Sequence, residues 1–149
     1  MVQATSDHEL IRNSIARYCI GVDLKDWKTF SNAFLDNAKV TFPGPGGTIE
    51  GATAIKAAVQ GMVGNLQTQH ALTTQLIEVT SEITANATTY CRAEIFGVGE
   101  DEGKRVTNWG IYQDKLLKGT FDGQEDWKIA ERNAIRTAPL AGDLSLIGM

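Results

Sequence analysis

The feature of this sequence that most restricts its fold is a series of four long segments in which apolar and polar residues alternate. The segments are rich in Thr, Val, Ile, Tyr and Trp and cover residues 68–79, 88–98, 105–118 and 126–137. Alternation with a period of two is typical of strands that bury one face. Short stretches of turn-forming residues separate the segments, so we predict a meander of four antiparallel strands in the second half of the chain.

The first half of the chain begins with a helical pattern. Ser6 and Glu9 match the capping box, in which a hydroxyl and a carboxylate three residues later cap the start of a helix. Apolar residues then recur at helical spacing as far as Val22, with Gly21 loosening the end, which predicts a helix over residues 7–22.

A second helix, a short strand and a third helix are expected before the meander. Asp26 caps the second helix, its apolar stripe extends to Phe34, and residues 36–37 form the turn that closes it. Residues 39–42 form the strand, and Thr53 caps the third helix. Helices early and antiparallel strands late indicate an α+β domain over residues 1–149, with an apolar C-terminal tail over residues 138–149.

Short residue groups spread over nearly the whole chain match a known pattern. In chain order they are Arg17-Tyr18, Val22-Asp23, Asp26-Trp27, Phe34, Asp36-Asn37-Ala38, Gly51, Gln69-His70, Tyr112-Gln113-Asp114 and Trp127-Lys128-Ile129 with Arg132. In this order the sequence resembles the SnoaL-like branch of the NTF2-like superfamily, which includes scytalone dehydratase and the bile-acid dehydratases. The resemblance implies an NTF2-like cone, with three N-terminal helices packed on a strongly curved, mainly antiparallel sheet that encloses a pocket.

The resemblance also implies a pair of catalytic side chains. It places Asp23, from the end of the first helix, beside His70 in the pocket wall, where a carboxylate can orient an imidazole that moves a proton. Tyr18 could donate a hydrogen bond to a developing oxyanion. On an ideal helix Tyr18 and Asp23 point about 140° apart, so we expect them to converge only if the backbone changes course near Gly21.

A second polar set lies on the last two predicted strands. If Trp127 and Ile129 face inward, strict alternation turns Glu131 inward too, where burial would suit it to act as a general acid. Asn108 and Tyr112 share a face of the preceding strand and are its candidate companions. Which strand face is concave stays open, so each of these side chains could instead point outward. Four apolar side chains are expected to contact a substrate: Trp27, Phe30, Phe42 and Met62.

Composition excludes several other classes of protein. The net charge of −4 and the pI of about 5.1 argue against a nucleic-acid surface and an anionic membrane surface. No apolar run is long enough to span a membrane, and the N-terminus lacks signal-peptide features. Cys19 and Cys91 have no CxxC partner, which favours a reducing, cytoplasmic location. With two histidines, no HExxH and no nucleotide or flavin motif, we expect neither a metal nor a cofactor.

Two functions from different classes fit these observations. The first is a cofactor-independent acid–base lyase or isomerase that acts on a polycyclic natural-product or steroid-like small molecule, as in secondary metabolism. The second is a non-catalytic NTF2-like module that binds a small molecule or a protein. An enzyme needs titratable groups that point into an apolar cavity, and Tyr18, Asp23 and His70 favour the enzyme.

We also expect a homo-oligomer, most simply a dimer built on the outer face of the long strands, because Val106, Trp109 and Ile111 span both faces of one strand.

Overall fold

The structure is a computed structural model that describes residues 3–149. Three α-helices lie within the first 63 residues: α1 (Asp7–Leu24), α2 (Trp27–Ser31) and α3 (Ala52–Val63). The strands are β1 (Phe34–Thr41), β2 (Thr48–Glu50), β3 (Gln67–Val79), β4 (Thr84–Phe96), β5 (Arg105–Phe121), β6 (Gln124–Arg136) and β7 (Ala141–Gly142). Two short 3-10 helices complete the chain, η1 (Gly99–Asp101) and η2 (Leu144–Ile147).

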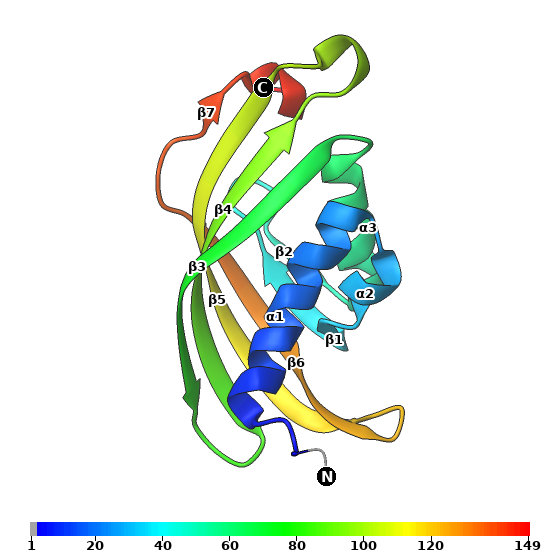
Figure 1. Cartoon of the computed structure of the whole chain (residues 1–149), viewed down its shortest axis with the longest axis vertical. Helices are drawn as coiled ribbons and strands as arrows, with labels where there is room; N and C mark the ends of the chain where they lie inside the picture. Colours follow the sequence, from blue (N-terminus) through cyan, green and yellow to red (C-terminus); the bar gives the residue numbers. More distant parts are fainter. Residues whose placement is uncertain (1–2) are drawn as a thin grey trace.

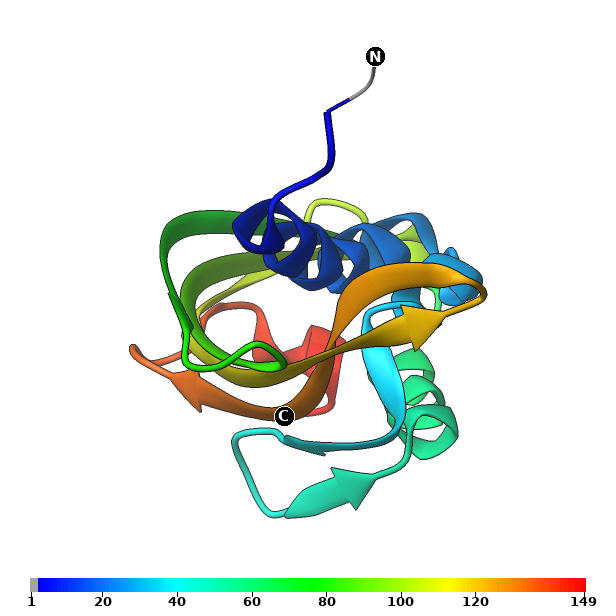
Figure 2. The same ribbon diagram turned by 90° about the horizontal axis from the view of Figure 1, so that it is seen from below.

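The strands form one mixed sheet, and the helices lie on its concave side. Its main path runs β2-β1-β6-β5-β4-β3, with β7 pairing with β5 beside that path. The β1–β6 pair is parallel and the others are antiparallel. Figure 1 shows α1 crossing the sheet, with α2 and α3 beside it, and Figure 2 shows the sheet curving around these helices. In the described chain β2 and β3 remain as edges, so the sheet is curved but not closed.

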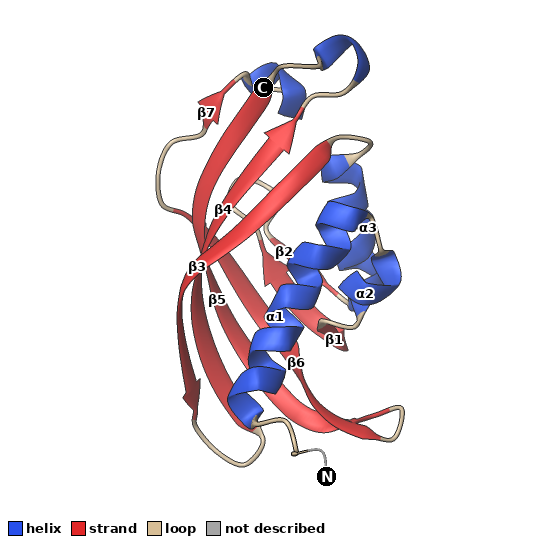
Figure 3. Ribbon diagram, viewed as in Figure 1, coloured by secondary structure: helices blue, strands red, loops and turns tan. Residues whose placement is uncertain are grey.

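The meander of four long strands is present in the predicted order, as Figure 3 shows. Strand β4 begins four residues earlier than the predicted segment, and β5 continues to Phe121, so that a turn at Asp122 and Gly123 joins it to β6. Both turn residues have positive φ, 50° and 80°, which suits the tight hairpin between two twisted strands.

Helix α1 starts as the sequence predicts and ends later. The Ser6 hydroxyl accepts from the Glu9 backbone N–H at 3.2 Å, and the Glu9 carboxylate accepts from the Ser6 N–H at 3.3 Å. The helix then runs without a break to Leu24. Gly21 does not loosen its end; a Cβ there would lie 2.5 Å from the backbone nitrogen of Phe30, so glycine is needed for α1 and α2 to pack.

The predicted second helix is too long, and the predicted cap of the third is misplaced. Helix α2 ends at Ser31, and Phe34 starts β1, so residues 36–37 lie inside a strand rather than in a turn. Phe34 is buried in the core although it lies in a strand, because an apolar side chain can reach the core from either a strand or a helix. Gly51, not Thr53, is the N-cap of α3, and β2 was not predicted at all.

A β-bulge in β6 reverses the face on which its side chains point. Leu116 of β5 pairs with Ile129, whereas the adjacent Lys115 pairs with Glu131, so Ala130 is an extra residue. Before the bulge, Trp127 and Ile129 are fully buried on the helix side; after it, Arg132 takes that side and Glu131 is exposed. One inserted residue changes the parity of the alternation, as expected for a strand with a period of two.

The residues after β6 return to the sheet instead of leaving it. Val106 pairs with Gly142 and Thr107 with Ala141, which attaches β7 to β5, and η2 follows directly. Gly142 has a φ of 114°, and a Cβ there would lie 2.1 Å from the Arg105 carbonyl oxygen, so only glycine fits this close approach. Within residues 3–149 no helix is long and apolar enough to cross a membrane.

Candidate active site

A cavity of about 630 Å³ lies between the concave face of the sheet and the helices. Its floor comes from β3, β4, β5 and β6, and its walls come from α1, α3 and the segment after β6. The lining is mostly apolar, with a few polar groups from the strands, which is the usual composition of a small-molecule site. Its volume lies within the range of cavities that bind small organic molecules, about 300–1,000 Å³.

Asp23 and His70 meet at the wall of this cavity. Oδ1 of Asp23, near the end of α1, lies 2.6 Å from Nδ1 of His70 on β3. The backbone N–H of His70 donates to Oδ2 of Asp23 at 2.8 Å, and the Thr68 hydroxyl donates to Oδ1 at 2.8 Å. The side chains of His70 and Asp23 are only 10% and 12% exposed, so water competes little for the pair. The structure therefore brings together the two residues that the resemblance implied.

The contacts of Asp23 decide which nitrogen of His70 can accept a proton. Burial raises the pKa of Asp23, but the hydrogen bonds from His70 and Thr68 outweigh it and hold the pKa below the ordinary 3.8. Asp23 is therefore a carboxylate at neutral pH, and it favours the tautomer that carries a proton on Nδ1. Nε2 has no hydrogen-bond partner within residues 3–149, and His70 lines the cavity, so Nε2 is the nitrogen available to a substrate.

Tyr18 and Tyr112 stand next to this pair. The ring of Tyr18 contacts His70 edge to face at 6.0 Å between centroids, and it contacts Tyr112 in the same manner at 5.7 Å. Tyr18 and Asp23 both reach His70 from an unbroken α1, one through its ring and the other through its carboxylate, so no change of backbone course is needed. Burial raises the pKa of both phenols, which keeps them protonated and able to donate at neutral pH.

A buried cation lies behind the two tyrosines. The Arg132 guanidinium carbon is 4.6 Å from the ring centroid of Tyr18 and 3.9 Å from that of Tyr112. Arg132 also donates two hydrogen bonds to Asp114, at 2.7 and 2.9 Å, and both side chains are 0% exposed. Its positive charge opposes the rise in the pKa of the phenols and strengthens them as donors. Arg132 and Asp114 are recognised from the sequence only as parts of the family pattern, because the bulge that turns Arg132 inward is not visible in the residue alternation.

The other predicted contact residues divide into two groups. Asn108, Tyr112, Phe42 and Met62 line the cavity. Trp27 and Phe30 do not: Phe30 is fully buried between α1 and α2, and Trp27 packs against it with ring centroids 5.4 Å apart. The prediction that these two contact a substrate is wrong, because their helix faces the core behind Tyr18 rather than the cavity.

Asn108 carries an unsatisfied polar atom. Its Oδ1 is buried and has no hydrogen-bond partner within residues 3–149. A buried acceptor without a donor costs about 1–3 kcal/mol, so this side chain is poorly explained as a structural element. A ligand that carries a hydroxyl or N–H group would remove that cost.

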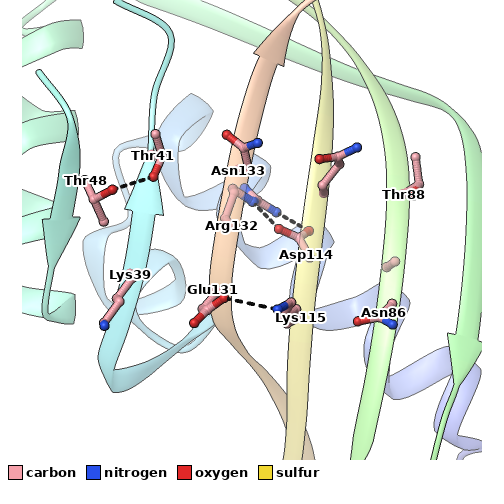
Figure 4. A pocket seen from close by; sticks show the side chains of 12 residues that line it. Lys39, Thr41, Thr48, Asn86, Thr88, Asp114, Lys115, Glu131, Arg132 and Asn133 are labelled. Carbon is pink, nitrogen blue, oxygen red and sulfur yellow. Dashed lines mark hydrogen bonds and ion pairs between the residues drawn. The ribbon is translucent and has the colours of Figure 1, made fainter. Parts of the chain in front are cut away.

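The prediction that Glu131 faces the cavity is wrong. Glu131 lies after the bulge on the outer face of the sheet, 3.6 Å from Lys115, with its side chain 53% exposed. Figure 4 shows this ion pair in a second hollow of about 480 Å³, which also includes Lys39, Asn86 and Asn133. That hollow is on the opposite face of the sheet from His70 and is open and polar, so Glu131 is not the buried carboxylic acid that the alternation predicts.

Several cavity residues were not identified from the sequence. Thr68 supports Asp23, Arg136 adds an exposed cation to the lining at the end of β6, and Cys91 adds a thiol. Burial raises the pKa of the Cys91 thiol, so it is a weak nucleophile. The apolar tail supplies four further lining residues, namely Leu140, Leu146, Ile147 and Met149. Among residues 3–149, no three His, Cys, Asp or Glu side chains gather as metal ligands would.

The fold and this cavity define a member of the SnoaL-like proteins. Residues 3–133 match the SnoaL-like domain, and the chain therefore belongs to that family, within the NTF2-like superfamily. It is 26% identical over 151 residues to the terrestric acid biosynthesis cluster protein E of Penicillium crustosum, across 99% of this chain and 94% of that protein.

Solved structures share the fold at low sequence identity. A candidate scytalone dehydratase from Novosphingobium aromaticivorans DSM 12444 is 22% identical, with a TM-score of 0.76 over 91% of this chain and 87% of that one. The hexachlorocyclohexane dehydrochlorinase LinA-type3 from Novosphingobium barchaimii LL02 is 18% identical, with a TM-score of 0.73 over 91% of this chain and 89% of that one.

Proposed function

We propose that this chain is a cofactor-independent acid–base enzyme that eliminates a leaving group from a small organic molecule or shifts one of its double bonds. The observation that carries the proposal is the pair formed by Asp23 and His70, 2.6 Å apart, at the wall of a largely apolar cavity of about 630 Å³. A neutral imidazole with one nitrogen held by a carboxylate and the other open to a cavity is arranged to act as a general base.

The proposed reaction begins with proton transfer from a substrate carbon to Nε2 of His70. The C–H electron pair then forms a double bond as the leaving group departs with its own electrons, or moves toward a carbonyl oxygen to form an enolate. The charged imidazolium is stabilised by the ionised carboxylate of Asp23. The same nitrogen can return its proton to the leaving group or to a second carbon, which gives a lyase or an isomerase respectively.

Tyr18 and Tyr112 are proposed to stabilise the negative charge that develops on the substrate. Both phenols stay protonated at neutral pH, and the guanidinium of Arg132 lies behind both rings. Donors fixed in a site that excludes water stabilise an oxyanion without reorganisation during the reaction.

The similar proteins support this proposal in general terms. One belongs by name to a biosynthesis cluster for terrestric acid, one is a dehydrochlorinase, and one is a candidate scytalone dehydratase. A natural product of secondary metabolism is accordingly the proposed substrate. The tail over residues 138–149 contributes lining residues, so we propose that it belongs to the same domain as residues 1–137.

The proposed base can be tested with a small carbon acid whose reaction needs only a base and no other contact with the protein. The probe is 5-nitrobenzisoxazole, from which a base removes the C–H proton while the N–O bond breaks, releasing a coloured cyanophenolate. We expect His70→Ala to lower the protein-catalysed rate about 10²- to 10⁴-fold, because a general base acts mainly in the transition state. Glu131→Gln is the matched control and should keep the wild-type rate. If His70→Ala keeps the rate, the proposed base is wrong.

We also propose that the chain is a homodimer that uses the outer face of the long strands. Tyr90 is 47%, Trp109 is 44% and Ile135 is 36% exposed on that face, and Ile111 lies among them between Tyr90 and Ile135. Apolar side chains gathered in this way favour burial by a second copy. Light scattering should give a dimer mass that Trp109→Lys reduces to the monomer; a monomer mass for the wild type at high concentration would exclude the dimer.

A further inference from the structure

The side chains that line the cavity carry an unbalanced charge. Among the described residues that line the cavity, Arg136 is the only Lys or Arg and none is an Asp or a Glu. The Asp23 carboxylate does not line the cavity itself, because it lies behind His70 and is paired with it. Within residues 3–149 the Arg136 guanidinium makes no ion pair and no side-chain hydrogen bond. In a chain with a net charge of −4, this cavity therefore combines a mostly apolar lining with one cation that has no anion beside it.

The pairing of the strands places this cation across the floor from the catalytic pair. His70 of β3 pairs with Ala93, and Ala93 pairs with Asn108, so these side chains form one row across three strands. In the next row Cys91 pairs with Gly110, and Gly110 pairs with Arg136 of β6. Neighbouring strands are about 4.8 Å apart, so the backbone of Arg136 lies roughly 14 Å across the sheet from β3.

The floor between His70 and Arg136 is open. Gly110, beside Arg136, has no side chain, and an added Cβ would lie 2.8 Å from the Ile135 carbonyl oxygen, so the close backbone of β6 requires glycine there. Ala93 leaves similar room beside His70. Asn108 lies between them, with the buried oxygen that has no donor in the described chain. A ligand body therefore has space to span from one end of the floor to the other.

We propose that the cavity binds an amphiphilic organic anion, whose carboxylate or other acidic oxygen pairs with Arg136. The apolar body lies on the floor and contacts Phe42, Met62 and Leu146, while a hydroxyl or N–H group of the body donates to Asn108. The reacting carbon lies at Nε2 of His70, at the other end of the ligand body from the anionic group. This last point rests on the proposed function, whereas the anion site itself does not.

Two fluorescent probes that differ only by a charged group test the anion site. The anionic probe is 1-anilinonaphthalene-8-sulfonate, and its neutral counterpart, N-phenyl-1-naphthylamine, lacks only the sulfonate. Arg136→Met removes the charge but keeps an apolar stem of similar length. We expect this variant to weaken binding of the sulfonate roughly five- to tenfold and to leave binding of the neutral probe unchanged. Arg136→Lys, which keeps the charge, should restore part of the lost affinity.

Arg12→Met is the matched control, because Arg12 is exposed on α1 and the substitution changes the net charge of the protein equally. It should leave the binding of both probes at the wild-type level. The inference is overturned if both arginine variants weaken the sulfonate equally, if the neutral probe is weakened as much as the sulfonate, or if the sulfonate does not bind the wild type. It is also overturned if Ala93→Phe, which fills the floor, leaves sulfonate binding unchanged, because the probe then binds outside the cavity.

The two proposals fail separately in these experiments. The rate of the benzisoxazole reaction tests His70 with a neutral probe, and the affinity for the sulfonate tests Arg136 without any reaction. His70→Ala should therefore lower the rate about 10²- to 10⁴-fold and keep the preference for the anionic probe, whereas Arg136→Met should reduce that preference and keep the rate.

Discussion

Two neighbouring ion pairs join the same two strands and lie on opposite faces of the sheet. On the inner face Arg132 of β6 pairs with Asp114 of β5 at 2.7 Å, and neither side chain is exposed. One residue along each strand, Glu131 pairs with Lys115 at 3.6 Å, with side chains 53% and 71% exposed. Figure 4 shows both pairs side by side.

The surroundings of an ion pair, rather than its residue types, decide what the pair contributes to stability. The exposed pair is screened by water and flexible, and such pairs contribute little to stability. The buried pair has lost its hydration, so either charge alone would be strongly unfavourable, and two tyrosine rings stack on its guanidinium. The pair formed by Asp23 and His70 lies between these extremes, nearly buried but at the wall of a cavity.

The largest expected effect comes from breaking the buried pair. Arg132→Met leaves the Asp114 carboxylate buried without a counter-ion, and we expect it to lower the free energy of unfolding by about 3–5 kcal/mol. Chemical denaturation followed by circular dichroism measures this loss. The double variant Asp114→Leu with Arg132→Met removes both charges and should recover most of the stability. If the single variant costs less than about 1 kcal/mol, the contrast between the two faces is wrong.

A smaller effect is expected from the pair at the cavity wall, and it depends on pH. Asp23→Asn weakens the contacts of the carboxylate with His70 and Thr68 and should cost about 1–3 kcal/mol at neutral pH. The pKa of Asp23 is lowered in the folded state, so its contribution is complete above the unfolded value of 3.8 and is lost as the pH falls through the folded pKa. Unfolding measured from pH 7 down to pH 3 should show the gap between wild type and variant closing as the solution becomes more acidic. A gap that stays constant would contradict the lowered pKa.

The smallest effect is expected on the outer face. Lys115→Met breaks the exposed pair with Glu131 and should change the free energy of unfolding by less than about 1 kcal/mol. Raising the salt concentration should reduce even this difference, because exposed charges are screened. Denaturation at low and high salt measures it. A loss as large as that of Arg132→Met would show that the outer hollow is not a simple solvated surface.

Much of the fold could be predicted because its patterns are local. The capping box at Ser6 and Glu9 and the alternation in the long strands depend on neighbours along the chain, and the structure has both. The helical spacing of Phe34 predicts a helix. An apolar residue at this position fits equally well in a strand that enters the core, so spacing alone cannot distinguish the two. Strand β2, with three residues, is too short to show any periodicity.

The site was only partly predictable, because it depends on contacts between distant residues. The resemblance implies that Asp23 lies beside His70, although the two are 47 residues apart in sequence. Propensity and residue spacing alone could not predict that contact. The assignment of Glu131 failed for a different reason, since alternation was extended from Ile129 across a bulge that no residue type marks. Arg136 was missed because the same bulge turns it onto the cavity side, where strict alternation from Trp127 would place it outside.

The bulge at Ala130 also determines which genetic changes this protein can tolerate. Exchanging one amino acid for another in β6 alters the contacts of one side chain, but adding or losing one codon between Trp127 and Arg132 would reverse the facing of every residue after it. The lost codon would turn Arg132 toward solvent and Glu131 toward the tyrosines. Changes of length at the turn formed by Asp122 and Gly123 avoid this outcome, because a hairpin tip can absorb them. Descendants of this sequence should therefore keep the length of β6 fixed and vary in residue type mainly at its exposed positions.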